Sequence, residues 1–234
     1  MGNYEFDVMI KLFVFRHAET FDNNRRIFSG WRDSELTPKG LEQGKKIAEQ
    51  LKHFQIDYAF TSHLKRARKT LELILAFHPS VSVCIDDRLI ERCYGSLQGR
   101  SKERFAHEDP ELYSQIHRGY EAVPPRGESL RMVERRVLSF LKQLKEWLKQ
   151  TSGNVAISCH GNSMRPIRRV FENLSLEQML CLENPQDHAM IYDLHLQKLL
   201  RCDKKESLQN WKGVRVPRKV KLAADPLNSL KRFY

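Results

Sequence analysis

The sequence predicts an α/β fold, a three-layer α/β/α sandwich around a mostly parallel central sheet. Short apolar runs typical of buried strands alternate with longer segments whose apolar residues recur at helical spacing, and this alternation is typical of strands joined by helical crossovers. The chain has 234 residues, of which 41% are hydrophobic and 29% are charged. A chain of this size and composition can bury a core as one domain, or at most two.

Five strands are expected, each a short apolar run: residues 10–15, 58–61, 81–85, 154–159 and 190–196. One helix should begin at Thr37-Pro38, because a threonine cap followed by proline favours a helix start. Ser62 is the expected cap of a second helix, residues 128–150 form a strongly periodic third, and a further helix opens at Gly161. Residues 86–127 are expected to be an irregular insertion, and such long loops are often functional.

The positive charge lies mainly at the C-terminal end. The net charge is +11, and residues 198–234 carry +8 of it, with 11 Lys and Arg against 3 Asp and Glu. We therefore divide the chain into one domain, residues 1–197, and a basic C-terminal tail, residues 198–234. A basic tail can bind nucleic acid, a membrane surface or an acidic ligand, but a solvated tail explains the charge equally well.

Several classes of protein are disfavoured. No apolar run is long enough to span a bilayer, and the N-terminus lacks the apolar stretch of a signal peptide. Five scattered cysteines without a paired motif indicate a reduced compartment and argue against structural zinc. We expect a cytoplasmic protein without a membrane partner.

Two histidines share one local context although they are 143 residues apart. His17 and His160 each follow an apolar strand and precede a polar segment that opens a helix. Because ligands of open α/β sheets bind at the carboxyl ends of strands, the two rings are expected to converge on one site.

The neighbouring residues indicate anion chemistry. Arg16 and Arg66 can hold phosphoryl oxygens through charge-assisted hydrogen bonds, and the backbone at Gly161 can bind an anion at a helix N-terminus. A neutral His17 would be a nucleophile toward phosphorus, and a protonated His160 would stabilise the charge on the transferred group. A small anionic phosphoester is the expected partner.

Phosphoryl transfer also needs a proton donor for the leaving oxygen. Glu91, in a glycine-rich loop, is the candidate general acid and base, with a pKa tuned by burial and by the bound dianion. The alternative is a structural ion pair between Glu91 and either Arg88 or Arg92.

These motifs together resemble the histidine phosphatase superfamily, and most closely its 2,3-bisphosphoglycerate-dependent phosphoglycerate mutase branch. The resemblance covers about residues 10–195, in the order and approximate spacing of the family. Its segments are Arg16-His17-Ala18-Glu19-Thr20, Ser29-Gly30-Trp31, Thr61-Ser62 with Leu64-Lys65-Arg66-Ala67, Glu91-Arg92-Cys93-Tyr94-Gly95-Ser96-Leu97-Gln98-Gly99, Gly127-Glu128-Ser129-Leu130 and His160-Gly161-Asn162-Ser163.

The resemblance implies that His17 becomes phosphohistidine, that Arg16, Arg66 and His160 form the phosphate pocket, and that Glu91 shuttles the proton. It implies an isomerase of glycolysis and gluconeogenesis, primed by 2,3-bisphosphoglycerate and without a metal. It further implies substrate contacts at Thr20, Asn23, Ser29, Gly30, Arg92, Tyr94, Lys102, His117, Arg118, Gly161 and Asn162. A homodimer is a possible assembly.

Three departures from the mutase pattern concern the site. Ala18 stands where a glycine is usual, His117-Arg118 replaces a tandem arginine, and Asn184-Pro185-Gln186-Asp187 replaces an isoleucine-proline-threonine-glycine stretch. They leave open a phosphomonoesterase of the same fold, in which water discharges the phosphoenzyme. A third hypothesis is a binding protein that uses its basic tail, but no nucleic-acid motif supports it, and no nucleic-acid partner is expected.

Overall fold

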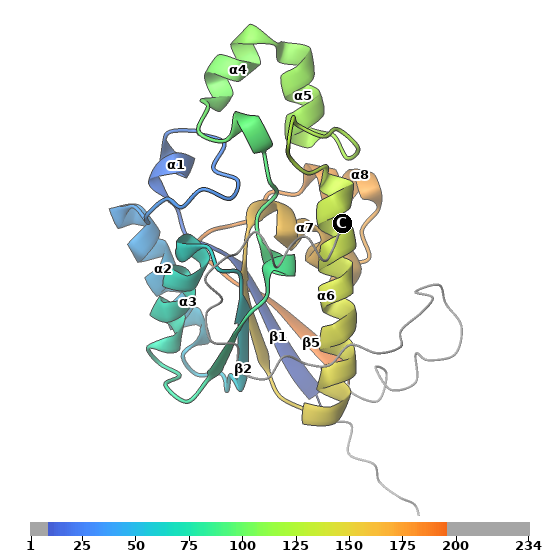
Figure 1. Ribbon diagram of the computed structural model, residues 1–234. Coiled ribbons are helices and arrows are strands. Elements are labelled where there is room, and N and C mark those ends of the chain that lie inside the picture. Colours follow the sequence, from blue (N-terminus) through green and yellow to red (C-terminus); the bar gives the residue numbers. More distant parts are fainter. Residues whose placement is uncertain (1–8, 196–234) are drawn as a thin grey trace, which may run out of the picture.

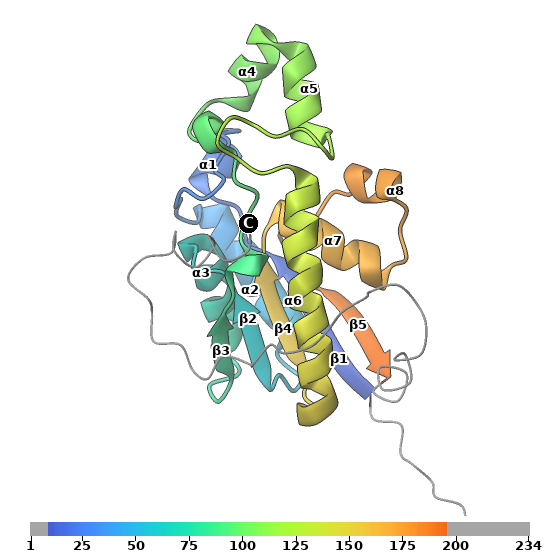
Figure 2. The same ribbon diagram turned by 45° about the vertical axis from the view of Figure 1, so that its right-hand side comes forward.

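The computed structural model describes residues 9–195, which form one five-stranded sheet with helices on both faces (Figures 1 and 2). Its strand order is β3-β2-β4-β1-β5, and only β5 runs antiparallel to its neighbour. The strands are β1 (Met9–Arg16), β2 (Tyr58–Thr61), β3 (Ser82–Ile85), β4 (Val155–Cys159) and β5 (Met190–His195). The predicted sandwich with a mostly parallel sheet is confirmed. Residue 196 and the predicted tail, residues 198–234, lie outside the described range.

Two pairs of helices form the outer layers. Helices α2 and α3 cover one face, and α6 and α7 cover the other (Figure 2). The helices are α1 (Phe21–Asn24), α2 (Pro38–Leu51), α3 (Lys65–Leu75), α4 (Lys102–Glu108), α5 (Pro110–Arg118), α6 (Leu130–Thr151), α7 (Gly161–Phe171) and α8 (Leu176–Cys181). Across residues 9–195, none of these helices has the length and apolar composition needed to cross a bilayer.

Strand β1 separates two hydrophobic cores. Ile10, Leu12 and Val14 pack with α6 and α7, whereas Phe13 and Phe15 pack with α2 and α3. Successive side chains of a strand point to opposite faces, so a slip of one residue would exchange the two sets and leave both cores mispacked. The register of β1 is therefore well defined, and with it the position of the residues that follow the strand.

The prediction that residues 86–127 are irregular is wrong. The segment contains α4 and α5, which stand above the carboxyl end of the sheet as a cap (Figure 1). Ser101 accepts a hydrogen bond from the backbone N–H of Arg104, and Asp109 caps α5, whose first residue is Pro110. These caps satisfy the backbone at the starts of helices that are too short to show a clear periodicity.

The cap has a small core of its own. It consists of Phe28, Tyr94, Leu97, Phe105 and Ile116, all buried. The rings of Phe28 and Tyr94 lie 4.8 Å apart. Because Phe28 follows α1 and Tyr94 belongs to the Glu91 loop, this core attaches the cap to the loops at the carboxyl end of the sheet.

The capping role predicted for Ser62 is also wrong. Helix α3 begins at Lys65 and its N-cap residue is Leu64, whose side chain makes no cap hydrogen bond; Oδ1 of Asp33 instead accepts from the backbone N–H of Lys65 at 3.0 Å. The Ser62 hydroxyl instead lies 2.7 Å from the ring of His160. The polar residue before this helix therefore belongs to the site.

Candidate active site

The two histidines meet at the carboxyl end of the sheet. Strands β1 and β4 are parallel neighbours that pair Arg16 with Cys159, so the residues that follow them lie side by side. The centroids of the His17 and His160 rings are 5.1 Å apart, and both rings are almost fully buried. His17 borders a polar cavity of about 160 Å³. The predicted convergence is confirmed.

Hydrogen bonds hold the His17 ring in one orientation. Its Nδ1 lies 2.8 Å from the carbonyl oxygen of Ala18, which can only accept, so Nδ1 carries the proton. Its Nε2 then presents a lone pair, which accepts a hydrogen bond from Nε of Arg66 at 3.2 Å. Burial, followed by the charges of Arg66 and Arg16, holds the pKa of His17 well below 6.5. A neutral ring with its lone pair at Nε2 is the state a nucleophile requires, and the Arg66 contact places that nitrogen beside a cation that can bind phosphoryl oxygens.

Arg66 is held rigidly from behind. Its two Nη atoms each donate a 2.7 Å hydrogen bond to a backbone carbonyl, that of Arg32 and that of Gly30. Burial lowers its pKa to about 10, which still leaves it charged near neutral pH. Gly30 has a φ of +53°, and a Cβ there would lie 2.1 Å from Oε1 of Gln98, so this turn requires glycine.

Three buried polar atoms around the histidines have no hydrogen-bond partner within the described part of the chain. They are Nε of Arg16, Oγ of Ser29 and Nδ1 of His160. The first two can donate a hydrogen bond, and Nδ1 of His160 can do so when it is protonated; a buried polar atom without a partner is costly. An oxyanion with several acceptor oxygens, such as a phosphoryl group, is the kind of ligand that would satisfy them together.

Glu91 contacts the start of α7, and within the described residues its carboxylate forms no ion pair with the guanidinium of Arg88 or Arg92, which the structural alternative required. One carboxylate oxygen accepts hydrogen bonds from the backbone of Arg92 at 2.8 Å and from the backbone and side chain of Asn162 at 3.1 and 3.0 Å. Arg88 instead pairs with Asp86. Burial is the largest influence on the pKa of Glu91 and raises it, but Arg66 and the other donors together lower it below 4.5. Glu91 is therefore a carboxylate in the unliganded site.

Most of the predicted substrate contacts border the same cavity. The residues that do so are Asn23, Ser29, Gly30, Tyr94, Lys102, His117, Gly161 and Asn162. Lys102 begins α4, and the His117 ring stacks on Tyr113 near the end of α5. The side chain of Arg118 is outside the described part of the structure.

Thr20 and Arg92 do not border the cavity, contrary to the sequence-based expectation. The Thr20 hydroxyl caps α1 by accepting from the backbone N–H of Asn23. The Arg92 guanidinium is fully buried and donates to three backbone carbonyls, at 2.7 to 2.8 Å. Both residues hold site loops in place, and neither presents a donor to the cavity.

Sequence reasoning missed four cavity residues, Ile27, Arg165, Glu183 and Asn184. Arg165 follows Asn162 by three residues on α7 and donates to its side-chain oxygen at 3.0 Å, so helical spacing could have revealed it. Asn184 donates to the carbonyl oxygen of Gly161 at 2.7 Å, and its own carbonyl lies 3.4 Å from Nη1 of Arg16. This segment was noted only as a departure from the mutase pattern.

A metal site can be considered at the same place. His17, Glu91 and His160 offer ligand atoms within 4.8 Å of one another. Arg66, however, donates a hydrogen bond to Nε2 of His17, and Arg16 lies close enough to the Glu91 carboxylate to lower its pKa. A divalent cation would have to displace one guanidinium and sit close to both, so the donor set suits an anion better.

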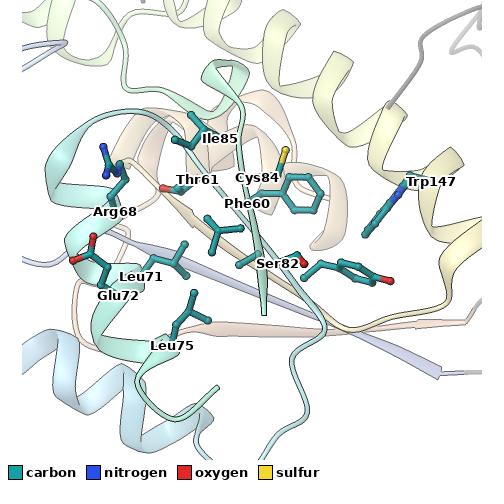
Figure 3. A pocket seen from close by; sticks show the side chains of 13 residues that line it. Phe60, Thr61, Arg68, Leu71, Glu72, Leu75, Ser82, Cys84, Ile85 and Trp147 are labelled. Atoms are coloured by element: carbon teal, nitrogen blue, oxygen red, sulfur yellow. The ribbon is translucent and has the colours of Figure 1, made fainter. Parts of the chain in front are cut away.

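A roomier hollow of about 460 Å³ lies at the edge of the sheet, between α3 and α6 (Figure 3). Its walls are mainly apolar and include Leu71, Leu75, Phe60 and Trp147. Size alone would favour it, but His17, Arg16 and Arg66 border the smaller cavity, and chemistry depends on those groups.

Comparison with known proteins agrees with this geometry. A family model described as "Histidine phosphatase superfamily (branch 1)" matches residues 12–199. A protein of Schizosaccharomyces pombe named phosphoglycerate mutase is 33% identical over 207 residues, covering 85% of this chain and 96% of its own. A Chlamydia trachomatis protein named 2,3-bisphosphoglycerate-dependent phosphoglycerate mutase is 31% identical over 223 residues, covering 82% and 97%.

A solved structure of a putative alpha-ribazole-5'-P phosphatase from Escherichia coli is also similar. It is 26% identical with a TM-score of 0.65, and the match covers 80% of this chain and 96% of that one. The fold and the paired histidines define an enzyme that handles phosphoryl groups. The chain belongs to the histidine phosphatase superfamily, whose members similar to it carry the names of both mutases and phosphatases.

Proposed function

We propose that this enzyme is a phosphoglycerate mutase that interconverts 3-phosphoglycerate and 2-phosphoglycerate, with a phosphohistidine at His17 primed by 2,3-bisphosphoglycerate. The observation that carries the proposal is that Lys102 and His117, on the cap, border the same small cavity as His17 and Arg16. A phosphoglycerate has two anionic ends. A cavity with basic groups on both the sheet side and the cap side suits such a substrate better than a simple phosphomonoester.

The chemistry would proceed in two half-reactions. Nε2 of His17 attacks the phosphorus of 2,3-bisphosphoglycerate, so that an N–P bond forms, the P–O ester bond breaks and the leaving oxygen takes a proton. In the second, a hydroxyl oxygen of phosphoglycerate attacks the phosphohistidine and loses its proton, and the N–P bond returns its electron pair to Nε2. The phosphoryl group moves between the 2- and 3-positions of glycerate if the bisphosphorylated intermediate reorients in the site before it leaves.

Glu91 is placed to move the proton in both directions. As a carboxylate it can accept the hydroxyl proton of the attacking phosphoglycerate. Phosphoryl oxygens bound to Arg16 and Arg66 would offset the positive charge that lowers the Glu91 pKa, and the carboxyl group can then hold the proton until the leaving oxygen needs it. Charge on the ligand thus couples binding to the protonation state of Glu91.

The remaining donors would stabilise the transferred group. Nε of Arg16 and Oγ of Ser29 are buried donors that await acceptors, and Nδ1 of His160 joins them when it is protonated. Phosphoryl transfer depends mainly on positioning and on such electrostatic stabilisation, and the loss of one donor typically costs ~100- to 1000-fold in rate. As a glycolytic and gluconeogenic enzyme, the protein would act in the cytoplasm.

A phosphatase of the same superfamily is the second candidate, and one observation favours it. Glu183 borders the cavity and lies close enough to Arg16 to raise the pKa of its guanidinium. An added negative charge at the cavity would repel the highly charged bisphosphoglycerate more than a monoester. Such repulsion would shorten the residence of the intermediate that a mutase must retain.

One assay separates the two candidates. Purified protein is incubated with 3-phosphoglycerate, with and without a trace of 2,3-bisphosphoglycerate, and both 2-phosphoglycerate and free phosphate are measured. A mutase forms 2-phosphoglycerate and is stimulated by the primer. Release of phosphate from an aryl phosphate without isomerisation would contradict the mutase and support the phosphatase.

A further inference from the structure

Gln186 links two parts of the cavity wall without bordering the cavity itself. Its Nε2 donates hydrogen bonds of 3.1 Å to the backbone carbonyl of His17 and to Oδ1 of Asn23. His17 and Asn23 both border the cavity, whereas Gln186 does not. One side-chain amide therefore joins the backbone of the proposed nucleophile to a predicted substrate contact on α1.

The direction of each hydrogen bond in this group is determined by its partners. The backbone N–H of Thr20 can only donate, and it lies 3.2 Å from Asn23, so the amide oxygen of Asn23 faces it. The carbonyl of His17 can only accept, so Gln186 must turn its amide nitrogen toward it. That nitrogen carries two protons, one for each acceptor. Neither amide can be turned round without losing both hydrogen bonds that it forms here.

The sheet holds only one side of the His17 backbone. Strand β1 pairs with β5 as far as Val14, opposite Met190, so His17 lies beyond that ladder. Its N–H donates at 2.9 Å to the carbonyl of Cys159, at the end of β4. Its carbonyl accepts from Gln186, in the segment that leads into β5. The two peptide groups of the nucleophile are thus held from two different elements.

The same contact determines what Asn23 can offer a ligand. Its Oδ1 accepts from both Thr20 and Gln186, and these two bonds use both lone pairs of the oxygen. The atom left for a ligand is Nδ2, which can only donate and therefore suits an anion. Because α1 has only four residues, the bond from Gln186 supports a side chain that its own short helix holds weakly.

We propose that Gln186 is a positioning residue, whose amide holds the backbone of His17 and the side chain of Asn23 in the arrangement that receives a phosphoryl group. It acts through these two residues. The inference rests on the phosphohistidine chemistry of the proposed function, but it applies equally to a mutase and to a phosphatase. It also gives a role to one of the residues that depart from the mutase pattern.

Gln186→Met keeps the length of the side chain and removes both donors. The measurement is the rate of phosphoryl transfer from 2,3-bisphosphoglycerate to His17, followed by rapid quench. We expect this rate to fall by about 10- to 100-fold, because a displacement of about 1 Å at a reacting group can cost as much as about 100-fold. An unchanged rate would overturn the proposal.

Gln186→Glu tests the donor itself. A carboxylate facing the two acceptor oxygens would repel them, whereas the protonated carboxyl group can donate to one of them. The rate of this variant, divided by the wild-type rate at each pH, should therefore rise as the pH falls, while the same ratio for Gln186→Met stays flat. A loss of packing alone would give both variants a flat ratio, and that result would contradict the proposal.

Gln50→Met is the matched control. Gln50 exchanges two hydrogen bonds with the backbone of Ala189, accepting at 2.7 Å and donating at 3.1 Å, and so attaches the segment before β5 to α2. It does not border the cavity. Its replacement also removes two hydrogen bonds, but should leave the transfer rate unchanged. If it slowed transfer as much as Gln186→Met, the effect would come from a loosened segment and the proposal would fail.

An NMR measurement on the full-length protein does not depend on activity. Histidine labelled with ¹³C at the carbonyl and alanine labelled with ¹⁵N give signals only from His-Ala pairs, of which the chain has two, His17-Ala18 and His188-Ala189. The first signal should move in Gln186→Met, which removes a hydrogen bond to that carbonyl, and stay in place in Gln50→Met, whose effect falls on the second. An unmoved first signal in Gln186→Met would overturn the proposal. If the wild type transfers no phosphoryl group, the proposed function fails, and this signal still decides whether Gln186 holds the backbone of His17.

Discussion

Single residues in the site depend on charge that is buried and shared. Arg16, Arg66 and Glu91 lie close together: Glu91 raises the pKa of both arginines, and both arginines lower the pKa of Glu91. Burial first, and then the charges of the arginines, lower the pKa values of His17 and His160 and keep both rings neutral. In the unliganded site the single carboxylate of Glu91 does not neutralise both Arg16 and Arg66. The remaining positive charge is already in place for a phosphoryl group, which can bind with little reorganisation of the protein.

The neutral histidines predict acid sensitivity. In the unfolded chain a histidine takes up a proton below about pH 6.5, but His17 and His160 resist it when folded, so stability is lost as pH falls below 6.5. Each ring should contribute up to about 1.4 kcal/mol per pH unit. Urea unfolding at several pH values checks this.

The variant His160→Asn should lose stability less steeply than the wild type between pH 6.5 and 5. The exposed ring of His53 supplies the control His53→Asn. An unchanged slope in His160→Asn would show that this ring is not held neutral.

Much of this site could be predicted from the sequence. The arginine-histidine motif and the later histidine follow strands, and strand ends are easy to find. Thr20 and Arg92 belong to equally distinctive motifs, yet they do not border the cavity. A motif records which residues occur together, but only the fold decides which side chain points to solvent, to a carbonyl or to a ligand. Ser62 illustrates this, because the sequence suggested a helix cap, whereas the fold places its hydroxyl 2.7 Å from the ring of His160.

At the scale of elements, α6 supports the loop that carries Glu91. Arg136 of α6 donates to the carbonyls of Arg88, Ile90 and Glu91 at 2.8 to 3.1 Å. It also forms a buried ion pair with Glu128 at 3.0 Å. One guanidinium thus joins the backbone that precedes the cap, at residues 88–91, to the side chain of Glu128, which follows the cap.

Arg136→Met should therefore destabilise the protein by about 3 to 5 kcal/mol, because it removes the main partner of a buried carboxylate. Chemical denaturation measures the loss. The matched control is Arg131→Met on the same helix, whose pair with Glu121 is two-thirds exposed on both sides and should contribute at most about 1 kcal/mol. Equal effects of the two variants would mean that the buried pair is not the more important one.

The elements were predicted unevenly. The strands agree with the predicted ranges to within one residue, and α6 begins two residues later than expected, because apolar runs and long helical periods are strong signals. The cap helices α4 and α5 have seven and nine residues, which is too short for periodicity to stand out between turns. Their positions depend on a core built from distant residues, such as Phe28 with Phe105, which a local pattern cannot reveal.

The whole molecule separates a structured catalytic unit from a strongly charged end. The sheet, both main cores and the cavity lie within residues 9–195. The excess positive charge of residues 198–234 lies outside that range. The proposed domain division is a prediction that follows from both facts.

A chain ending at residue 197 should therefore fold and retain the thermal midpoint of the full chain to within a few degrees. Differential scanning calorimetry measures this, and the same pair of proteins can be applied to immobilised DNA. Unfolding of the shortened chain would contradict the division. Salt-dependent retention of the full chain only would revive the hypothesis of a binding tail.

The central claim is that Nε2 of His17 forms a covalent bond to phosphorus. The most direct measurement is incorporation of labelled phosphoryl groups from 2,3-bisphosphoglycerate, followed by acid and alkaline treatment and peptide mapping. We predict one phosphoryl group per chain, labile to acid, stable to alkali and located on His17, with no incorporation in His17→Ala. Substantial labelling of His17→Ala, or label on another residue, would contradict the account.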